Sequence, residues 1–200
     1  EVGQLSLAFD LRSTTESYEW SVDASTINTA QPGRETTNRS DVGLGYRHFL
    51  GSRWFALAGT SAQHNDELGL DLRARIDLGA GQYLVQSTDM LLSAGTGASF
   101  NRELYTGGED SNNVEAFLGI DYAWFLLDSP KLDLDTSVTV YPSLTNSGRV
   151  RAQADFRVRK EFVKDLFLSV KLYGDYDSEP PASDTSSGDY GVVLSVDYSW

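Results

Sequence analysis

Two histidines are the first candidates for chemistry, because a serine nucleophile needs a base beside it. His48 is followed by Phe49 and Leu50, so the His-x-Ser arrangement that some membrane lipases use is absent. His64 lies in the segment His64-Asn-Asp-Glu67, and Ser61 is the nearest candidate nucleophile. An ordinary polar loop explains this segment more simply, so we predict no catalytic residue. One histidine beside carboxylates is equally weak as a metal site, and we expect neither a metal nor a cofactor.

The composition excludes several other classes of protein. The chain has 200 residues, the size of one domain, and we treat residues 1–200 as a single domain. It has no cysteine, which rules out disulfides, thiolate zinc sites and cysteine nucleophiles. Sixteen basic residues stand against 29 acidic residues, so the net charge is −13 and we expect no nucleic-acid partner.

Charged residues recur at every second position in several segments, the spacing that places side chains on one face of a β-strand. From Leu68 to Leu78, leucine, alanine and isoleucine alternate with glycine, aspartate and arginine, so Leu68, Leu70 and Leu72 share the apolar face. Carboxylates and guanidinium groups that project into one confined space pair with each other. The predicted set of such charges is Asp71, Arg73, Arg75, Asp77, Glu115, Asp121, Asp133, Asp135, Arg151, Asp155, Arg157, Arg159 and Lys171.

The same alternation covers almost the whole chain and predicts an all-β, antiparallel fold. Helix propensity is poor throughout, because glycine, threonine, serine and aspartate recur every few residues. The eleven predicted strands are 2–11, 17–28, 40–49, 53–63, 68–78, 89–101, 114–124, 132–140, 150–158, 166–177 and 190–200.

Alternation alone does not say which face is inside. A soluble sandwich or lipocalin-like barrel buries the leucines, whereas a transmembrane barrel turns them to lipid and encloses the charges. The strands have the length of roughly nine to eleven residues that a bilayer requires, and short connections alternate with longer ones such as 29–39 and 103–112. We therefore predict an up-and-down transmembrane β-barrel.

Aromatic residues support the membrane interpretation. Trp20 and Trp54 follow short turns and Trp124 precedes one, so in up-and-down order they share a rim with the last residue. Amphipathic rings favour the membrane–water interface, although aromatic residues also favour strands in general. The predicted aromatic girdle is Tyr18, Trp20, Tyr46, Trp54, Tyr122, Trp124, Tyr198 and Trp200.

Two segments resemble the salt-induced outer-membrane protein family, a group of bacterial barrels of unknown function. The stretch from Tyr173 to Asp184 resembles its closing hairpin, and Gly69 to Gly81 resembles its central strand after an acidic tip at 65–67. The last strand, with Leu194, Val196, Tyr198 and Trp200, resembles the signal that the outer-membrane assembly machinery reads. The resemblance implies a Gram-negative outer membrane, contact with its lipid and lipopolysaccharide, and a C-terminus at the periplasmic rim.

The strand count departs from the family's pattern, which begins with one more strand and a polar turn. Single-chain bacterial barrels have an even number of strands. We therefore expect about twelve strands in the complete protein, with one upstream strand missing from this chain. Alternatively the count is off by one, in the weak segments 2–11, 53–63 or 89–101.

Twelve tilted strands enclose a backbone cylinder roughly 24 Å across, which leaves a narrow bore. The barrel is then either a narrow pore for ions or small solutes, with selectivity set by the paired charges, or a structural barrel filled by its own salt bridges. Inward Gly79, Gly95, Gly97 and Gly119 are expected to leave room for arginines, and Glu103 to lie in a solvated outer loop. The alternative from another class is an outer-membrane hydrolase with a site near His64.

Overall fold

The computed structural model describes residues 3–30, 32–33, 36–105, 110–126, 130–180 and 186–198 of the chain. These residues form one antiparallel sheet of eleven strands, and each strand pairs with its neighbours in the sequence. The strands are β1 (Gly3–Thr14), β2 (Tyr18–Ala30), β3 (Thr37–Leu50), β4 (Trp54–Asn65), β5 (Leu70–Gln86), β6 (Met90–Tyr105), β7 (Ser111–Leu126), β8 (Leu132–Pro142), β9 (Val150–Val163), β10 (Leu166–Asp177) and β11 (Gly188–Tyr198). The predicted all-β, up-and-down fold is confirmed. None of the described residues forms a helix that is long and apolar enough to span a membrane.

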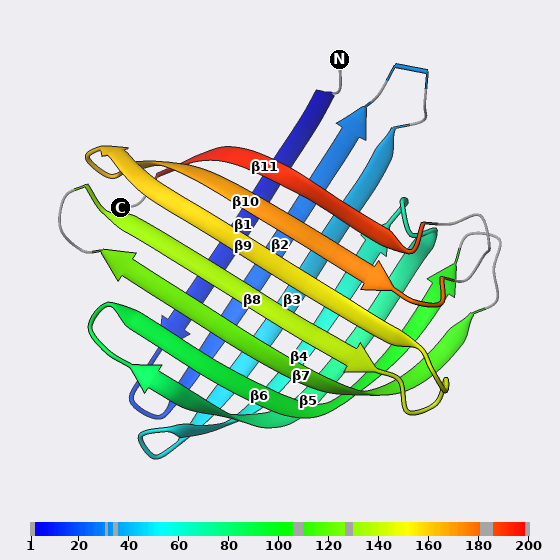
Figure 1. The fold of residues 1–200 in the computed structure, drawn as a ribbon, viewed down its shortest axis with the longest axis horizontal. Coiled ribbons are helices and arrows are strands. Elements are labelled where there is room, and N and C mark those ends of the chain that lie inside the picture. Colours follow the sequence, from blue (N-terminus) through cyan, green and yellow to red (C-terminus); the bar gives the residue numbers. More distant parts are fainter. Residues whose placement is uncertain are drawn as a thin grey trace.

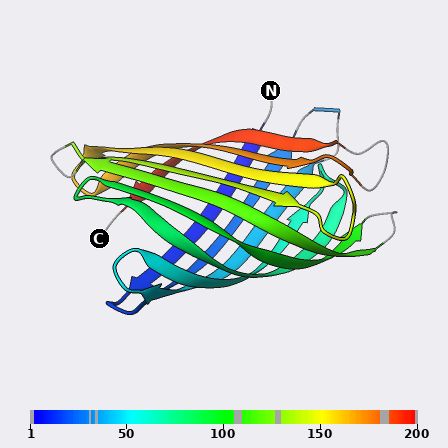
Figure 2. The ribbon, with the colours of Figure 1, turned by 60° about the horizontal axis from the view of Figure 1, so that its bottom comes forward.

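The sheet curls into a nearly closed, flattened barrel. Figure 1 shows the wall of β6–β11 lying across the wall of β1–β5, and Figure 2 shows the same two walls facing each other. Strands that are not neighbours in the sheet touch through the space between the walls. Arg75 on β5 donates to Gln153 on β9 at 3.2 Å, and Arg47 on β3 lies 3.3 Å from Asp121 on β7. The polar face of the sheet therefore lines the interior, which we call the lumen.

The connections gather at two ends, because the chain reverses direction after every strand. One end, the short-turn end, carries the connections 15–17, 51–53, 87–89, 127–131 and 164–165. The other end, the long-loop end, carries the connections 31–36, 66–69, 106–110, 143–149 and 178–187.

The outer face of the barrel is apolar. Leu72, Ile120 and Val138 are 38%, 55% and 43% exposed, and each of the eleven strands has at least one large exposed apolar side chain. A soluble β-sandwich would bury these side chains in its core. Their exposure, with the charges enclosed, is the arrangement of a barrel that lies in lipid.

One prediction about the faces of the sheet is wrong. Leu68 and Leu70 lie inside the barrel, 5% and 1% exposed, where they pack with Tyr105. The pairing of β5 with β6 shifts between Leu70 and Leu72, so Asp71 is an extra residue in the ladder. A bulge of this kind moves the residues on one side of it to the opposite face. The strict alternation expected from Leu68 onward therefore begins only at Leu72.

Three inward glycines of β5 and β6, namely Gly79, Gly81 and Gly97, make room for aromatic rings rather than for arginines. A Cβ atom at Gly79 or at Gly97 would lie 2.7 Å from the ring of Phe117, and one at Gly81 would overlap the ring of Phe55. Both rings are buried in the lumen. The expectation that these glycines accommodate long arginines is therefore wrong at Gly79 and Gly97.

The first and last strands of the sheet run in the same direction, because all odd-numbered strands of an up-and-down sheet do. They therefore cannot pair with each other as antiparallel neighbours, and the described residues show no pairing between β1 and β11. Leu7 on β1 and Leu194 on β11 both have exposed side chains. The twelfth strand stays a prediction.

A charge on the outer face should lower the free energy of unfolding only where lipid surrounds it. Leu118 lies near the middle of β7 and is 57% exposed, whereas Leu132 begins β8 at the short-turn end. We expect Leu118→Arg to lower the free energy of unfolding by about 2–4 kcal/mol and Leu132→Arg by about 0–1 kcal/mol. Urea titration in lipid vesicles, followed by tryptophan fluorescence, measures both values. Equal costs at the two positions would contradict a lipid-facing surface.

The close packing of the glycines gives a second prediction. A Cβ at Gly97 would overlap the carbonyl oxygen of Leu78 as well as the Phe117 ring, whereas one at Gly95 on the same face would have no heavy atom closer than 3.5 Å. Overpacking costs about 1–3 kcal/mol. We therefore expect Gly97→Ala to lower the free energy of unfolding by that amount in the same urea titration and Gly95→Ala to change it little. A Gly95→Ala variant as unstable as Gly97→Ala would show that the described packing is wrong.

Candidate functional site

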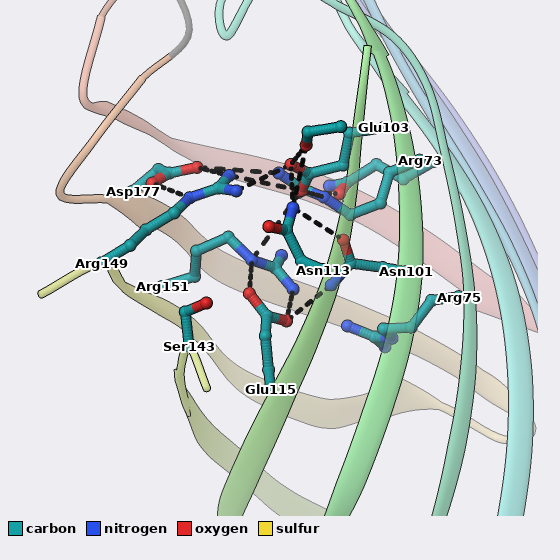
Figure 3. Close-up of polar contacts among 12 residues, drawn as sticks. Arg73, Arg75, Asn101, Glu103, Asn113, Glu115, Ser143, Arg149, Arg151 and Asp177 are labelled. Carbon is teal, nitrogen blue, oxygen red and sulfur yellow. Dashed lines mark hydrogen bonds and ion pairs between the residues drawn. The ribbon is translucent and has the colours of Figure 1, made fainter. Parts of the chain in front are cut away.

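Glu103 is the centre of a buried ion-pair network at the long-loop end of the lumen (Figure 3). It lies on β6, and its side chain is fully buried. Its Oε1 accepts a hydrogen bond of 2.6 Å from Nε of Arg73 on β5, and its Oε2 accepts one of 2.8 Å from Nη1 of Arg149. The hydroxyl of Tyr105 donates to Oε2 at 2.5 Å. One carboxylate thus holds two guanidinium groups from opposite walls.

Arg149 extends this network across the barrel. It lies directly before β9 and donates to Asp177, the last residue of β10, from Nε at 3.0 Å and from Nη2 at 2.5 Å. Two-point pairing of this kind makes arginine–carboxylate contacts strong and directional. Because β6 and β10 are not neighbours in the sheet, the contact from Glu103 through Arg149 to Asp177 crosses the lumen. We call it the Arg149 bridge.

A second buried layer lies beside the Arg149 bridge. Glu115 on β7 accepts hydrogen bonds from Arg151 on β9, through Nε at 2.8 Å and through Nη2. Asn101 donates to the same carboxylate at 2.8 Å, and Asn113 donates to Glu103 at 3.0 Å, which joins the two layers. The side chains of the ion-pair network are 0–6% exposed, and they are Arg73, Glu103, Glu115, Arg149, Arg151 and Asp177.

The charges nearer the short-turn end have a different environment. Asp133 pairs with Arg159 at 2.5 Å, Asp135 with Arg157 at 3.0 Å, and Asp155 with Lys171 at 2.8 Å. Each pair joins adjacent strands of one wall, and the side chains are 22–46% exposed. We call these three pairs the charge ladder. The charged side chains of the lumen are therefore accessible to solvent along the charge ladder and buried at the ion-pair network.

The thirteen charged residues predicted from the sequence thus fall into separate groups. Arg73, Glu115 and Arg151 belong to the ion-pair network, and six form the charge ladder. Arg75 and Asp77 pair with each other at 3.0 Å on β5, and Asp121 meets Arg47. Asp71 lies at the bulge of β5, where its side chain is exposed and its carbonyl oxygen lies 2.9 Å from Nδ1 of His64.

Sequence reasoning missed the centre of the network. Glu103 was expected in a solvated loop, but β6 continues to Tyr105 and keeps Glu103 buried opposite Arg73. The inward series Ser99, Asn101, Glu103 was the signal that could have shown this. Arg149 and Asp177 were missed because each lies at the boundary of a strand. A further missed contact joins Arg39 on β3 to three carboxylates, those of Asp41, Asp175 and Asp189.

The predicted aromatic girdle lies partly within the described residues. Tyr18, Tyr46 and Trp54 have exposed side chains at the short-turn end, and the Tyr18 and Tyr46 rings stack with centroids 6.1 Å apart. Trp20, Tyr122 and Trp124 are partly exposed near the same end of their strands. Of the predicted assembly signal, Leu194 and Val196 are exposed on β11. The Tyr198 side chain and Trp200 lie outside the described residues.

His64 offers little to a hydrolase. Its Nδ1 lies 2.9 Å from the carbonyl oxygen of Asp71 and its Nε2 lies 3.1 Å from Asp66. Ser61 has the opposite parity on β4, so it faces the lumen while His64 faces outward. Within the described ranges, no group of three or more histidine, aspartate or glutamate side chains is placed to hold a metal ion.

Two solved structures are similar to this chain. The NanC porin, in a rhombohedral crystal form, superposes with a TM-score of 0.61 at 11% sequence identity, covering 100% of this chain and 98% of that chain. The KdgM porin in complex with disordered oligogalacturonate gives a TM-score of 0.45 at 9% identity, covering 99% of each chain. At such identities the likeness to NanC concerns the fold alone. A comparison with curated proteins finds no match.

The family profile described as a protein of unknown function, DUF481, matches residues 2–200. The match spans nearly the whole sheet, from the first described strand to the end of β11. The chain therefore belongs to the DUF481 family, the salt-induced outer-membrane proteins that its sequence resembles, and it is a porin-like outer-membrane β-barrel.

Proposed function

We propose that this barrel is a narrow pore for ions or small solutes, closed at its long-loop end by the ion-pair network. The observation that supports this most is the Arg149 bridge, which joins Glu103 on one side of the lumen to Asp177 on the other. An ion moving through this layer would have to displace charged groups that water does not reach. The short-turn end, with the hydrated charge ladder, then faces the periplasm.

The ion-pair network has equal numbers of positive and negative groups. This equality would allow the network to open without leaving a net charge in the lumen. The network contains three guanidinium groups and three carboxylates, each with a partner of opposite sign. The attraction within a buried ion pair is largely offset by the loss of hydration. Separating both partners into water therefore requires less free energy than their short distances suggest. Removing one partner alone is strongly unfavourable, because it leaves a buried charge without a counter-ion.

The position of Arg149 offers a way to open the network. It ends the connection 143–149, where Gly148 has a positive φ of 97° and the Arg149 amide donates to the carbonyl oxygen of Asn146 at 3.2 Å. Connections change conformation more easily than strands do. A movement of this connection would withdraw the Arg149 side chain and break the contact between Glu103 and Asp177.

Single-channel recording in planar bilayers tests the closure. The double variant Arg149→Ala with Asp177→Ala removes the bridge without a change in net charge, so we expect several-fold higher conductance than the nearly silent wild type. The matched control is Arg157→Ala with Asp135→Ala, which removes an ion pair from the charge ladder, and its conductance should stay close to that of the wild type. A bridge variant as silent as the wild type would instead identify a structural barrel.

The proposed orientation can be tested in cells, because residues 1–200 contain no cysteine. Ser147→Cys places a thiol in the connection 143–149, and Ser52→Cys places one in the turn 51–53. With a membrane-impermeant maleimide, we expect labelling of Ser147→Cys in intact cells and of Ser52→Cys only after the outer membrane is permeabilised. The reverse pattern would show that the long-loop end faces the periplasm.

A further inference from the structure

A cavity of about 140 Å³ opens into the lumen between the ion-pair network and the short-turn end. Its boundary toward the network is Tyr141 on β8, whose ring centroid lies 5.0 Å from the guanidinium carbon of Arg151. A solute that entered from the short-turn end would reach this cavity directly before the closure.

The cavity has an accessible pair of opposite charges on one side. Nη2 of Arg47 on β3 lies 3.3 Å from Oδ2 of Asp121 on β7, and the two side chains are 28% and 51% exposed. Both groups are held in place. The Arg47 guanidinium lies over the Phe55 ring, 5.1 Å from its centroid, and the Ser137 hydroxyl donates to Asp121 at 3.0 Å.

The remaining lining is mainly apolar or bare, but it also includes Thr139, Tyr141 and Asp77, whose carboxylate pairs with Arg75 at 3.0 Å. Phe117 and Leu57 supply apolar surface, and Gly95 and Gly119 present backbone without a side chain. A cavity of about 150 Å³ accommodates a molecule the size of benzene, so this one suits a ligand of a similar number of heavy atoms. Such a ligand would place its apolar part against Phe117 and its polar end at Arg47 and Asp121.

We infer that the cavity binds a small zwitterion, a molecule with an ammonium and a carboxylate group on neighbouring atoms and a short apolar group. The ligand's carboxylate would accept charge-assisted hydrogen bonds from Arg47, and its ammonium would donate to Asp121. A simple anion would leave Asp121 facing a like charge, and a simple cation would leave Arg47 facing one. The zwitterion thus replaces the single Arg47–Asp121 contact with two.

This inference rests on the proposed function only in that solutes reach the lumen from the short-turn end. It names the class of solute that would bind on the short-turn side of the ion-pair network. Binding to the purified barrel in detergent is measured independently of conductance. A barrel that binds the zwitterion but never conducts would overturn the proposed pore and leave the site intact.

Isothermal titration with three matched probes tests the site. L-valine carries both charged groups, isovalerate carries only the carboxylate, and isobutylamine carries only the ammonium, on nearly the same apolar group. We expect isovalerate and isobutylamine to bind about tenfold more weakly than L-valine, because each loses one set of charge-assisted hydrogen bonds. Equal binding of all three probes, or no binding of L-valine, would overturn the inference.

Two variants assign the roles of the charged pair. Asp121→Asn should remove the preference for L-valine over isovalerate, and Arg47→Gln should remove the preference over isobutylamine. Gly95→Val fills the cavity at a position where a Cβ meets no close atom, so it should weaken all three probes. Asp135→Asn, in the charge ladder, is the matched control and should leave binding unchanged. A uniform loss of binding in Asp121→Asn and Arg47→Gln would show a structural rather than a recognition role.

Discussion

The structure depends on one constraint, which is that lipid offers no hydrogen bonds to a polypeptide. Every backbone amide and carbonyl group within the bilayer must find a partner in the protein, and a curled antiparallel sheet provides it for all groups except those on the outer edges of β1 and β11. The outer face must then be apolar, as Ile120 and Val138 are. Because strand side chains alternate between faces, most charges on the spanning segments are directed into the lumen. The density of ion pairs there follows from this exclusion.

The inward charges differ in what lies next to them. Along the charge ladder, Asp135 and Arg157 join adjacent strands of one wall and keep much of their hydration. At the long-loop end, Glu103 and Asp177 belong to strands that face each other across the lumen, and Arg149 fills the space between them. In the proposed pore, the first arrangement lines the path and the second closes it. The same types of residue thus serve two purposes, according to whether their partner lies beside them or opposite.

The sequence was sufficient for those features that depend on neighbouring residues. Period-two alternation predicted eleven strands and their antiparallel order, because these follow from local geometry. The length of the strands, the alternation of short and long connections and the positions of the aromatic residues then predicted that the charged face is inside, which holds from Leu72 onward. It could not predict the bulge at Asp71, since an extra residue in a ladder depends on the pairing partner. It also could not find the Arg149 bridge, because Glu103 and Asp177 are brought together only by the curvature of the whole sheet. The rings of Phe55 and Phe117 beside the glycines are non-local in the same way.

The proposed closure is better understood as a specific arrangement of ion pairs than as a contribution to the free energy of folding. Buried ion pairs regain through attraction roughly what they lose in hydration, so the six charges of the network add little to the free energy of folding. They do, however, disfavour every arrangement in which one of them lacks its partner. The closed lumen and a fully opened, rehydrated lumen both satisfy this condition, whereas partly opened states do not. A network of this composition therefore separates two states sharply, and a modest difference in affinity for a solute or a loop conformation would shift the balance between them.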